Sequence, residues 1–272
     1  MTIVGNFPHF FERHSGHNHN PILIDHKKQI SRPIIFVQGA IIRDTMDAGE
    51  QTNLRKKILL LVPAGFLVLG LIFFVPAGTL DYWEAWVYCA VLLVPFVVVL
   101  IYLMRKDPEL LARRMRLREK EPAQKRIVGA SGIIFFVGFL IPGLDHRFGW
   151  SEVPVGMVLA ANALVFFGYV LVFLVFLENP FASRVVEVEP GQKVISTGPY
   201  ALVRHPMYLG TSIMWLATPI ALGSYWALPV FFILPLVLVY RILNEEEVLL
   251  RELPGYREYI QKVRYRLVPF IW

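Results

Sequence analysis

Long apolar segments separated by clusters of charged residues constrain this 272-residue chain more than any other feature. A helix needs about 20 residues, each rising about 1.5 Å, to cross about 30 Å of hydrocarbon. Only 18% of the residues are charged, whereas a soluble domain usually carries about a quarter. We therefore expect an all-α fold, a polytopic transmembrane helical bundle of about six spans. The six segments are Ile58–Leu80, Trp83–Met104, Val128–Leu144, Pro154–Leu177, Tyr208–Gly223 and Trp226–Tyr240.

The last two apolar segments are the shortest, and only a tight link at Gly223, Ser224 and Tyr225 joins them. Such a connection between apolar runs predicts a short helical hairpin. Composition divides the whole chain into three parts. They are a poorly structured N-terminal segment (1–55), four spans with a basic cytoplasmic loop at 105–127 (56–177), and a C-terminal region that carries the chemistry in a loop, the hairpin and a C-terminal helix (178–272).

Basic residues give the orientation of the predicted spans. Of the 27 Lys and Arg residues, 26 lie on one side of a six-span topology, and Arg147 alone lies on the other. Positively charged loops of membrane proteins face the cytoplasm. We therefore predict a multi-pass membrane protein with both termini in the cytoplasm, in the inner membrane of a bacterium or the endoplasmic reticulum of a eukaryote. Arg113, Arg114, Arg116 and Arg118 fit either an interfacial helix or a solvated basic loop.

The remaining composition excludes several kinds of site. Cys89 is the only cysteine and lies within an apolar segment, so neither a disulfide framework nor a cysteine metal site is expected. Closely spaced histidines such as His14, His17 and His19 lie in the N-terminal segment, where they more often bind nothing specific, so we expect no metal. The net charge is +6, and the basic residues flank apolar segments. We therefore expect the lipid bilayer as a partner and no nucleic acid.

The sequence GPYALVRHPMYLG, at residues 198–210, is the first polar cluster in the last third of the chain. Pro206 disfavours a helical conformation at His205 and suits the first turn of a helix, so a helix is predicted to begin there. Its free backbone N–H groups would lie beside Arg204, His205 and Tyr208 as an anion site. On this motif alone, an ordinary helix start with interfacial Arg and Tyr anchors fits equally well.

The sequence RILNEEEVLLRELPGYREYIQKVRYRLVPFIW, at residues 241–272, is the second polar cluster. On a helix that continues from the last span, Arg241 and Glu245 are four residues apart and share a face. Three consecutive acids, Glu245 to Glu247, cannot all be buried without partners. Some of them are expected to face Arg241, Arg204 or a cationic ligand, although a solvated acidic turn would also explain them.

The predicted hairpin brings these two clusters together at the boundary between membrane and cytoplasm. A helix start, two arginines, a histidine, tyrosines and a pair of carboxylates would then converge. A ligand with both a carboxylate and a positive centre satisfies such a set. S-adenosylmethionine is one, with a carboxylate and an amine at one end, a sulfonium in the middle and an adenine that aromatic residues can flank.

The two motifs, about thirty residues apart, resemble those of the isoprenylcysteine carboxyl methyltransferase family of integral membrane methyltransferases. The match covers about Gly191 to Pro269. The resemblance implies S-adenosyl-L-methionine as cofactor, bound by the cytoplasmic loop and the ends of the last spans, and a lipophilic methyl acceptor that enters from the bilayer. It implies cofactor contacts at Gln192, Lys193, Val194, Ile195, Tyr200, His205, Pro206, Met207, Tyr208 and Glu245.

The resemblance also implies that Arg241 meets the carboxylate of the acceptor. We further expect Arg204 to orient the carboxylates at the site and Glu246 to pair with an arginine. Methyl transfer to a carboxylate needs no strong base, because that group is already ionised, so the enzyme has to align and desolvate the reactants. An acceptor amine would need a base, for which His205 or Glu246 would be candidates. A small isoprenoid acid, a phospholipid amine or a thiol also fits a pocket that faces the bilayer.

Two other functions remain open from the sequence. A membrane NADPH-dependent reductase of lipids or sterols has a similar motif, R-H-P-N-Y-x-G followed by an acid, but here Met207 replaces the Asn and Thr211 follows the Gly. A non-catalytic membrane protein, such as a transporter or scaffold, would need polar residues buried along its spans. Asn162 and Tyr169 are the only candidates of that kind.

Overall fold

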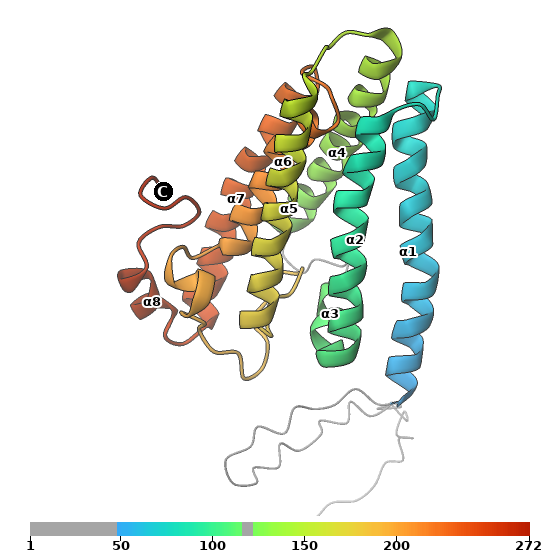
Figure 1. Cartoon of the computed structure of the whole chain (residues 1–272). Helices are drawn as coiled ribbons and strands as arrows, with labels where there is room; N and C mark the ends of the chain where they lie inside the picture. The colour runs from blue at the N-terminus through green and yellow to red at the C-terminus, as the bar shows by residue number, and fades with distance from the viewer. Residues whose placement is uncertain (1–47, 116–121) are drawn as a thin grey trace, which may run out of the picture. The chain divides into compact units, whose positions relative to one another are not determined.

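The computed structural model describes residues 48–115 and 122–272, which form helices joined by turns and loops and contain no strand. Figure 1 shows the long helices running side by side. The all-helical fold predicted from the sequence is therefore confirmed, and five of the described helices are long and apolar enough to cross a membrane. The helices are α1 (Ala48–Ala77), α2 (Trp83–Lys106), α3 (Pro108–Arg114), α4 (Pro122–Phe148), α5 (Val155–Glu178), α6 (Pro206–Ala221), α7 (Leu228–Glu252) and α8 (Tyr256–Lys262), with a 3₁₀ turn, η1, at Gly198–Ala201.

The long helices pack in an order that differs from their order in the chain. Helix α1 packs on α4, α4 on α7, α7 on α6, α6 on α5 and α5 on α2. Aromatic side chains then join α2 to α1, where the rings of Phe66 and Phe96 lie edge to face with their centroids 5.9 Å apart. The most extensive of these contacts is between α5 and α6. The C-terminal half of the chain thus supplies neighbouring helices in the bundle, which is where the two polar clusters meet.

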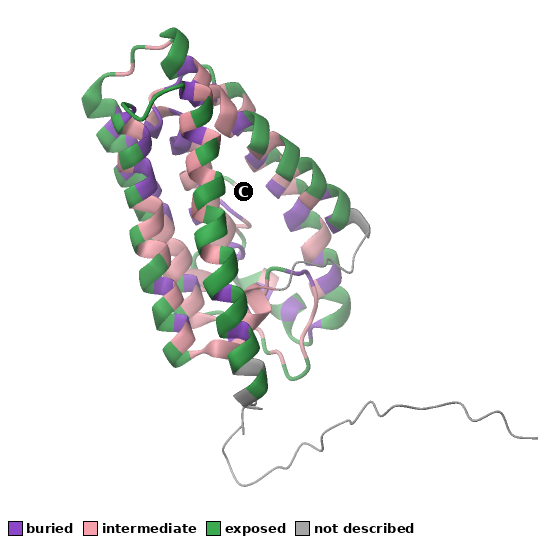
Figure 2. Ribbon diagram, turned by 90° about the vertical axis from the view of Figure 1, so that its right-hand side faces the viewer, coloured by how far each residue is buried: buried purple, intermediate pink, exposed green. Residues whose placement is uncertain are grey.

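Figure 2 shows exposed residues, in green, along the long helices. Many of them are large apolar residues. On α1, Leu59 is 75% exposed and Leu67 is 65% exposed. A water-soluble protein rarely exposes apolar surface so continuously, whereas hydrocarbon solvates it well. These faces therefore fit contact with lipid.

Helix α6, the first helix of the predicted hairpin, is short, as the sequence indicated. Its 16 residues measure about 24 Å at 1.5 Å per residue, which is less than the hydrocarbon thickness. None of its residues is exposed, because neighbouring helices enclose it. An enclosed helix has no lipid-facing side that must match the bilayer. The chain before Pro206 forms part of the candidate site.

Other helix boundaries also differ from those predicted. Helix α7 runs for 25 residues from Leu228 to Glu252, so only α6 is short in the predicted hairpin. Helix α4 likewise extends well beyond the predicted segment 128–144. Helix α1 begins at Ala48, inside the segment expected to be poorly structured. The histidine cluster, Arg116 and Arg118 lie outside the described residues.

Two glycines allow α5 and α6 to approach closely. A Cβ on Gly168 would lie 2.6 Å from the Gly210 carbonyl oxygen, and a Cβ on Gly210 would lie 2.7 Å from the Gly168 carbonyl oxygen. Such distances are far below van der Waals contact, so only glycine fits at both positions. At the other end of α6, the Tyr82 hydroxyl donates to the Leu222 carbonyl at 2.6 Å. These two contacts fix the position of α6 along its length, and thereby the position of its N-terminal end.

We predict that Gly168→Ala destabilises the protein by about 1–3 kcal/mol, the usual cost of overpacking a close contact. The added methyl group would force α5 and α6 apart. The matched control is Gly156→Ala on the same helix, where nothing lies within 4 Å of the added Cβ. Equilibrium unfolding in detergent measures both variants. Equal stability of the two would contradict the proposed close packing.

Candidate functional site

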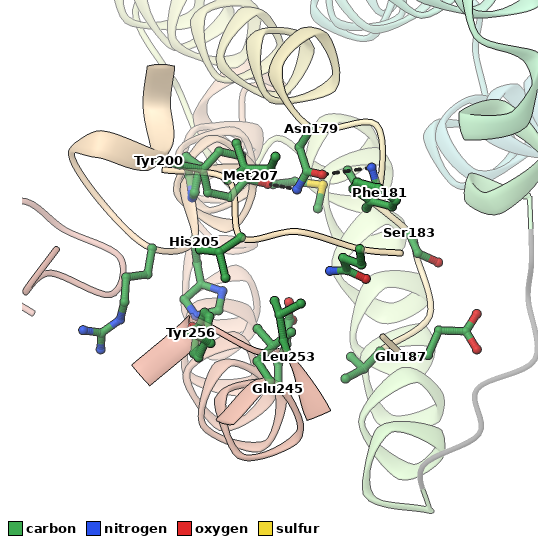
Figure 3. A pocket seen from close by; sticks show the side chains of 18 of the residues that line it. Asn179, Phe181, Ser183, Glu187, Tyr200, His205, Met207, Glu245, Leu253 and Tyr256 are labelled. Atoms are coloured by element: carbon green, nitrogen blue, oxygen red, sulfur yellow. Dashed lines mark hydrogen bonds between the residues drawn. The ribbon is translucent and has the colours of Figure 1, made fainter. Parts of the chain in front are cut away.

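A pocket lies where α5 ends and α6 begins, bounded by the α5–α6 loop (residues 179–205), α7 and α8. Its cavity volume is about 100 Å³, and part of the pocket is open to solvent. In Figure 3, Asn179, Tyr200 and Met207 lie along one side of the pocket, and Leu253, Tyr256 and Glu245 lie along another. Residues from both polar clusters of the sequence therefore share one cavity.

Helix α6 begins at Pro206, as the His-Pro pair predicts, with His205 as the residue before it. The backbone N–H groups of Arg204 and His205 donate to the carbonyls of Tyr265 and Arg266, each at 2.9 Å. The N–H groups of Tyr208 and Leu209 both donate to the His205 carbonyl at 3.1 Å. Because of these bonds, fewer N–H groups in the first turn are available to a ligand than the sequence led us to expect.

Glu246 is a buried carboxylate that contacts two arginines and a histidine. Arg204 Nε lies 2.7 Å from Oε1, His205 Nε2 3.3 Å from Oε1, and Arg266 Nε 2.8 Å from Oε2. Arg204 also donates through Nη1 to the Val263 carbonyl at 3.0 Å. The cluster therefore joins the start of α6, the C-terminal part of α7 and the C-terminal segment of the chain. We call these four side chains the Glu246 cluster.

Tyr208, Glu245 and Arg241 form a second polar group, at the pocket wall. The Tyr208 hydroxyl donates to Glu245 Oε2 at 2.6 Å and accepts from Arg241 Nε at 2.9 Å. Arg241 also donates through Nη1 to Gln124 Oε1 at 2.8 Å and through Nη2 to the Arg184 carbonyl at 2.7 Å. The guanidinium is thus held in one orientation at the boundary between α4, α7 and the loop.

Gln124 is a residue of this site that sequence reasoning missed. It is fully buried on α4, and its Nε2 donates to Asn244 Oδ1 at 2.6 Å while its Oε1 accepts from Arg241. A lone glutamine ahead of an apolar segment gives no signal of such a role. Only the packing of α4 against α7 brings it to the arginine.

Arginines of α3 hold the α5–α6 loop. Arg113 Nη2 donates to the Pro180 carbonyl at 2.7 Å, and Arg114 Nη1 donates to the Ser183 carbonyl at 3.1 Å. Burial lowers the pKa of the Arg114 guanidinium, with the positive charges of Arg184 and Arg241 acting in the same direction. The sequence predicted either an interfacial helix or a solvated basic loop for these arginines. In the structure both lie in the last turn of α3 and donate to carbonyls of the α5–α6 loop.

Tyrosines line the pocket on the side of the loop and α8. The Tyr200 hydroxyl accepts from Asn179 Nδ2 at 2.8 Å, and the Tyr200 carbonyl accepts from the Tyr259 hydroxyl at 2.7 Å. Burial raises the pKa of Tyr200 to about 12, so its phenol stays neutral at physiological pH and keeps a proton to donate. Tyr256 also lines this wall. Aromatic faces and neutral hydroxyls together suit a flat, polar ring system.

All ten cofactor residues predicted from the sequence lie at this pocket, together with Arg204 and Arg241, whereas Glu246 lies behind the wall. The two motifs are separated in the sequence, but they meet at this pocket because α6 and α7 are antiparallel neighbours. Further residues line the pocket without a signal in the sequence. They include Asn179, Phe181, Ala182, Ser183, Arg184, Val185, Val186, Glu187, Leu249, Leu253, Tyr256 and Tyr259.

Residues 156–256 match the family model described as phospholipid methyltransferase. This family includes membrane methyltransferases of the isoprenylcysteine carboxyl methyltransferase type, so the resemblance read from the two motifs is confirmed. A Delta(14)-sterol reductase, TM7SF2 of Mus musculus, is 32% identical over 105 residues, which cover 36% of this chain and 25% of that protein. The chain thus matches about a quarter of the length of this curated relative.

We predict that Glu246→Gln destabilises the protein by about 3 kcal/mol, because it leaves Arg204 buried without its counter-charge. The adjacent Glu247 is exposed, so Glu247→Gln is the matched control and should change stability by less than about 0.5 kcal/mol. Equilibrium unfolding of both variants in detergent checks this. A neutral Glu246→Gln would show that the cluster does not hold the α6 start in place.

Proposed function

We propose, on the premise that residues 156–256 belong to the phospholipid methyltransferase family, that this multi-pass membrane protein is an S-adenosylmethionine-dependent methyltransferase acting on a lipophilic acceptor. The observation that carries the proposal is the pairing of Glu245 and Arg241 through the Tyr208 hydroxyl at one pocket wall. A carboxylate for a cationic ligand and a guanidinium for an anionic one are thereby placed side by side, as a reaction between a sulfonium and a carboxylate requires.

The described residues of the pocket fit the cofactor chemically. Glu245 offers a carboxylate to its cationic end, and Tyr200 and Tyr259 offer aromatic surface to its adenine. The Tyr256 hydroxyl is buried with no hydrogen-bond partner in the described part of the chain, which fits a wall that is completed by a polar ligand. Gln192, Lys193, Val194 and Ile195 also line the pocket. When bound, S-adenosylmethionine supplies an electrophilic methyl group.

Arg241 is placed to hold the acceptor. Its three partners, on α4, α6 and the loop, fix the guanidinium at the pocket wall, so an acceptor carboxylate would meet an oriented donor. Exposed apolar faces of the surrounding helices fit an acceptor with a lipid tail that approaches from the bilayer. The chain's contribution is then to align two charged groups and to exclude water.

The position of Glu246 disfavours it as the base for an amine acceptor, whereas His205, the other candidate base, lines the pocket and contacts Glu246. A protonated amine has to lose a proton before it is methylated, and Glu246 was one candidate base. In the structure Glu246 contacts Arg204, His205 and Arg266 and does not line the pocket. It is therefore poorly placed to take a proton from an acceptor. Isoprenylated cysteine or a small isoprenoid acid is the acceptor class we propose.

The pocket is proposed to face the cytoplasm. Arg204 and Lys193 at the pocket, Arg113 and Arg114 on α3, and the basic residues after α7 all lie at one end of the helices or in the segments next to it. The positive-inside rule assigns that end to the cytoplasm. The cofactor is water-soluble and the acceptor is lipophilic, so a site at this boundary can be reached by both.

A lipid reductase is the second candidate function, and the identity to a sterol reductase is the observation that favours it. A nicotinamide cofactor carries phosphates that require cationic partners. Arg204 makes contacts with Glu246 and with the carbonyls of Val263 and Arg264. The other arginines and lysines at the pocket wall are Arg184, Lys193 and Arg241, and Arg241 lies beside the carboxylate of Glu245, to which the Tyr208 hydroxyl links it. The methyltransferase therefore fits the charges of this pocket better.

We predict that Glu245→Gln weakens binding of S-adenosylhomocysteine at least about 10-fold, the usual effect of losing one charged hydrogen bond. Glu247→Gln, one residue further and exposed, is the control and should bind as the wild type does. Equilibrium dialysis of the detergent-purified protein measures both. Unchanged affinity of the Glu245 variant would exclude this carboxylate from the cofactor site.

We predict that Arg241→Lys lowers kcat/KM for a short isoprenylated cysteine about 100-fold, because an ammonium cannot form the same two-pronged contact. Binding of S-adenosylhomocysteine should change little. Transfer of a radiolabelled methyl group measures the rate, with the carboxamide of the same acceptor as the substrate control and the exposed Arg251→Lys as the variant control. Full activity of Arg241→Lys would contradict its role at the acceptor.

A further inference from the structure

Tyr256 is held rigidly at the start of α8. It follows Gly255, whose φ of 85° sets the sharp entry into the helix. The side chain is only 4% exposed and packs in a cluster with Leu253, Tyr259 and Val263. Its ring also lies at the pocket, close to Leu253 in the view of Figure 3. The position of its hydroxyl is therefore set by the protein and not by a ligand.

The hydroxyl of Tyr256 is buried and has no hydrogen-bond partner among the described residues. Buried hydroxyls are nearly always paired, because an unpaired one loses its bonds to water without compensation. Other unpaired buried atoms, such as Asn162 Oδ1 and Ser212 Oγ, belong to side chains that do not line the pocket. The Tyr256 hydroxyl differs from them in belonging to a side chain that lines the pocket.

Tyr259 provides the contrast within the same helix. It is also buried, lines the same pocket and lies one turn further along α8. Its hydroxyl, however, donates to the Tyr200 carbonyl at 2.7 Å and thereby ties α8 to the loop. The two tyrosines therefore differ in hydrogen bonding. The hydroxyl of Tyr259 has a partner within the protein, and that of Tyr256 has none among the described residues.

We propose that the Tyr256 hydroxyl is a ligand-binding group of the pocket, which donates a hydrogen bond to an acceptor atom of the bound S-adenosyl cofactor. This inference rests on the proposed function. Burial, together with the charges of Glu246 and Glu245, raises the pKa of Tyr256, so the phenol is neutral and has its proton to give. The role is one of binding, since a neutral phenol at this wall takes no part in the transfer itself.

The test compares Tyr256→Phe with Tyr259→Phe, in thermal unfolding of the free protein and in equilibrium dialysis with S-adenosylhomocysteine. Tyr256→Phe removes an unpaired polar atom, so the free protein should keep or raise its unfolding temperature, while affinity falls about 3- to 15-fold, the worth of one hydrogen bond. Tyr259→Phe should instead lower the unfolding temperature of the free protein, because it breaks the bond to the Tyr200 carbonyl.

The outcomes separate this inference from the proposed function. If the Tyr256→Phe variant binds S-adenosylhomocysteine as tightly as the wild type does, the inference is overturned and the methyltransferase proposal stays intact. A marked loss of unfolding temperature in free Tyr256→Phe would also overturn it, since the hydroxyl would then have a structural partner. Failure of the wild type itself to bind S-adenosylhomocysteine would overturn the proposed function, and the inference with it.

Discussion

The ion cluster around Glu246 is the interaction on which the candidate site depends. It links the residues before α6, the C-terminal part of α7 and the C-terminal segment of the chain through one buried carboxylate. Backbone bonds from Arg204 and His205 to the C-terminal segment reinforce it. Breaking a buried ion pair from one side typically costs about 3–5 kcal/mol, because the remaining charge is left uncompensated. The pocket wall formed by Tyr208 and Glu245 therefore owes its position to a neighbouring carboxylate that does not line the pocket.

The short length of α6 gives the site its depth. Helix α7 continues beyond the level at which α6 begins, so the α5–α6 loop and α8 fill the space that a longer α6 would have taken. Gly168 and Gly210 fix the height of α6 against α5, and the Tyr82 hydroxyl binds the Leu222 carbonyl at its far end. A recess that starts inside the bundle and opens at its end is suited to one polar and one lipophilic reactant.

Sequence patterns predicted well which segments form helices and which residues line the site. They predicted less well where the helices end and which distant side chains contact each other. The His205-Pro206 pair located the start of α6, because proline restricts the residue before it and fits the first helical turn. Apolar runs underestimated α4 and α7, because polar residues continue these helices beyond their apolar parts. The pattern of apolar residues therefore predicts the central part of a helix better than it predicts the residues at which the helix begins and ends.

Contacts between distant parts of the chain could not be predicted in the same way. Gln124 reaches Arg241 from α4, and Arg114 reaches the Ser183 carbonyl from α3, although neither residue belongs to a motif. Which side chain meets a buried donor depends on the rotation and height of each helix, and these follow from packing at contacts such as Gly168 with Gly210. The two motifs predicted residues that line the site. The residues that hold this wall in place, such as Gln124 and Arg114, became known only from the packing of the helices.

The most direct test of the account is a calorimetric titration of the detergent-purified wild-type protein with S-adenosylhomocysteine and, in parallel, with NADPH. A pocket with Glu245 for a cationic ligand and few basic side chains for phosphates should bind the first saturably and show no binding of the second. Saturable binding of NADPH without binding of S-adenosylhomocysteine would contradict the methyltransferase account and favour the reductase.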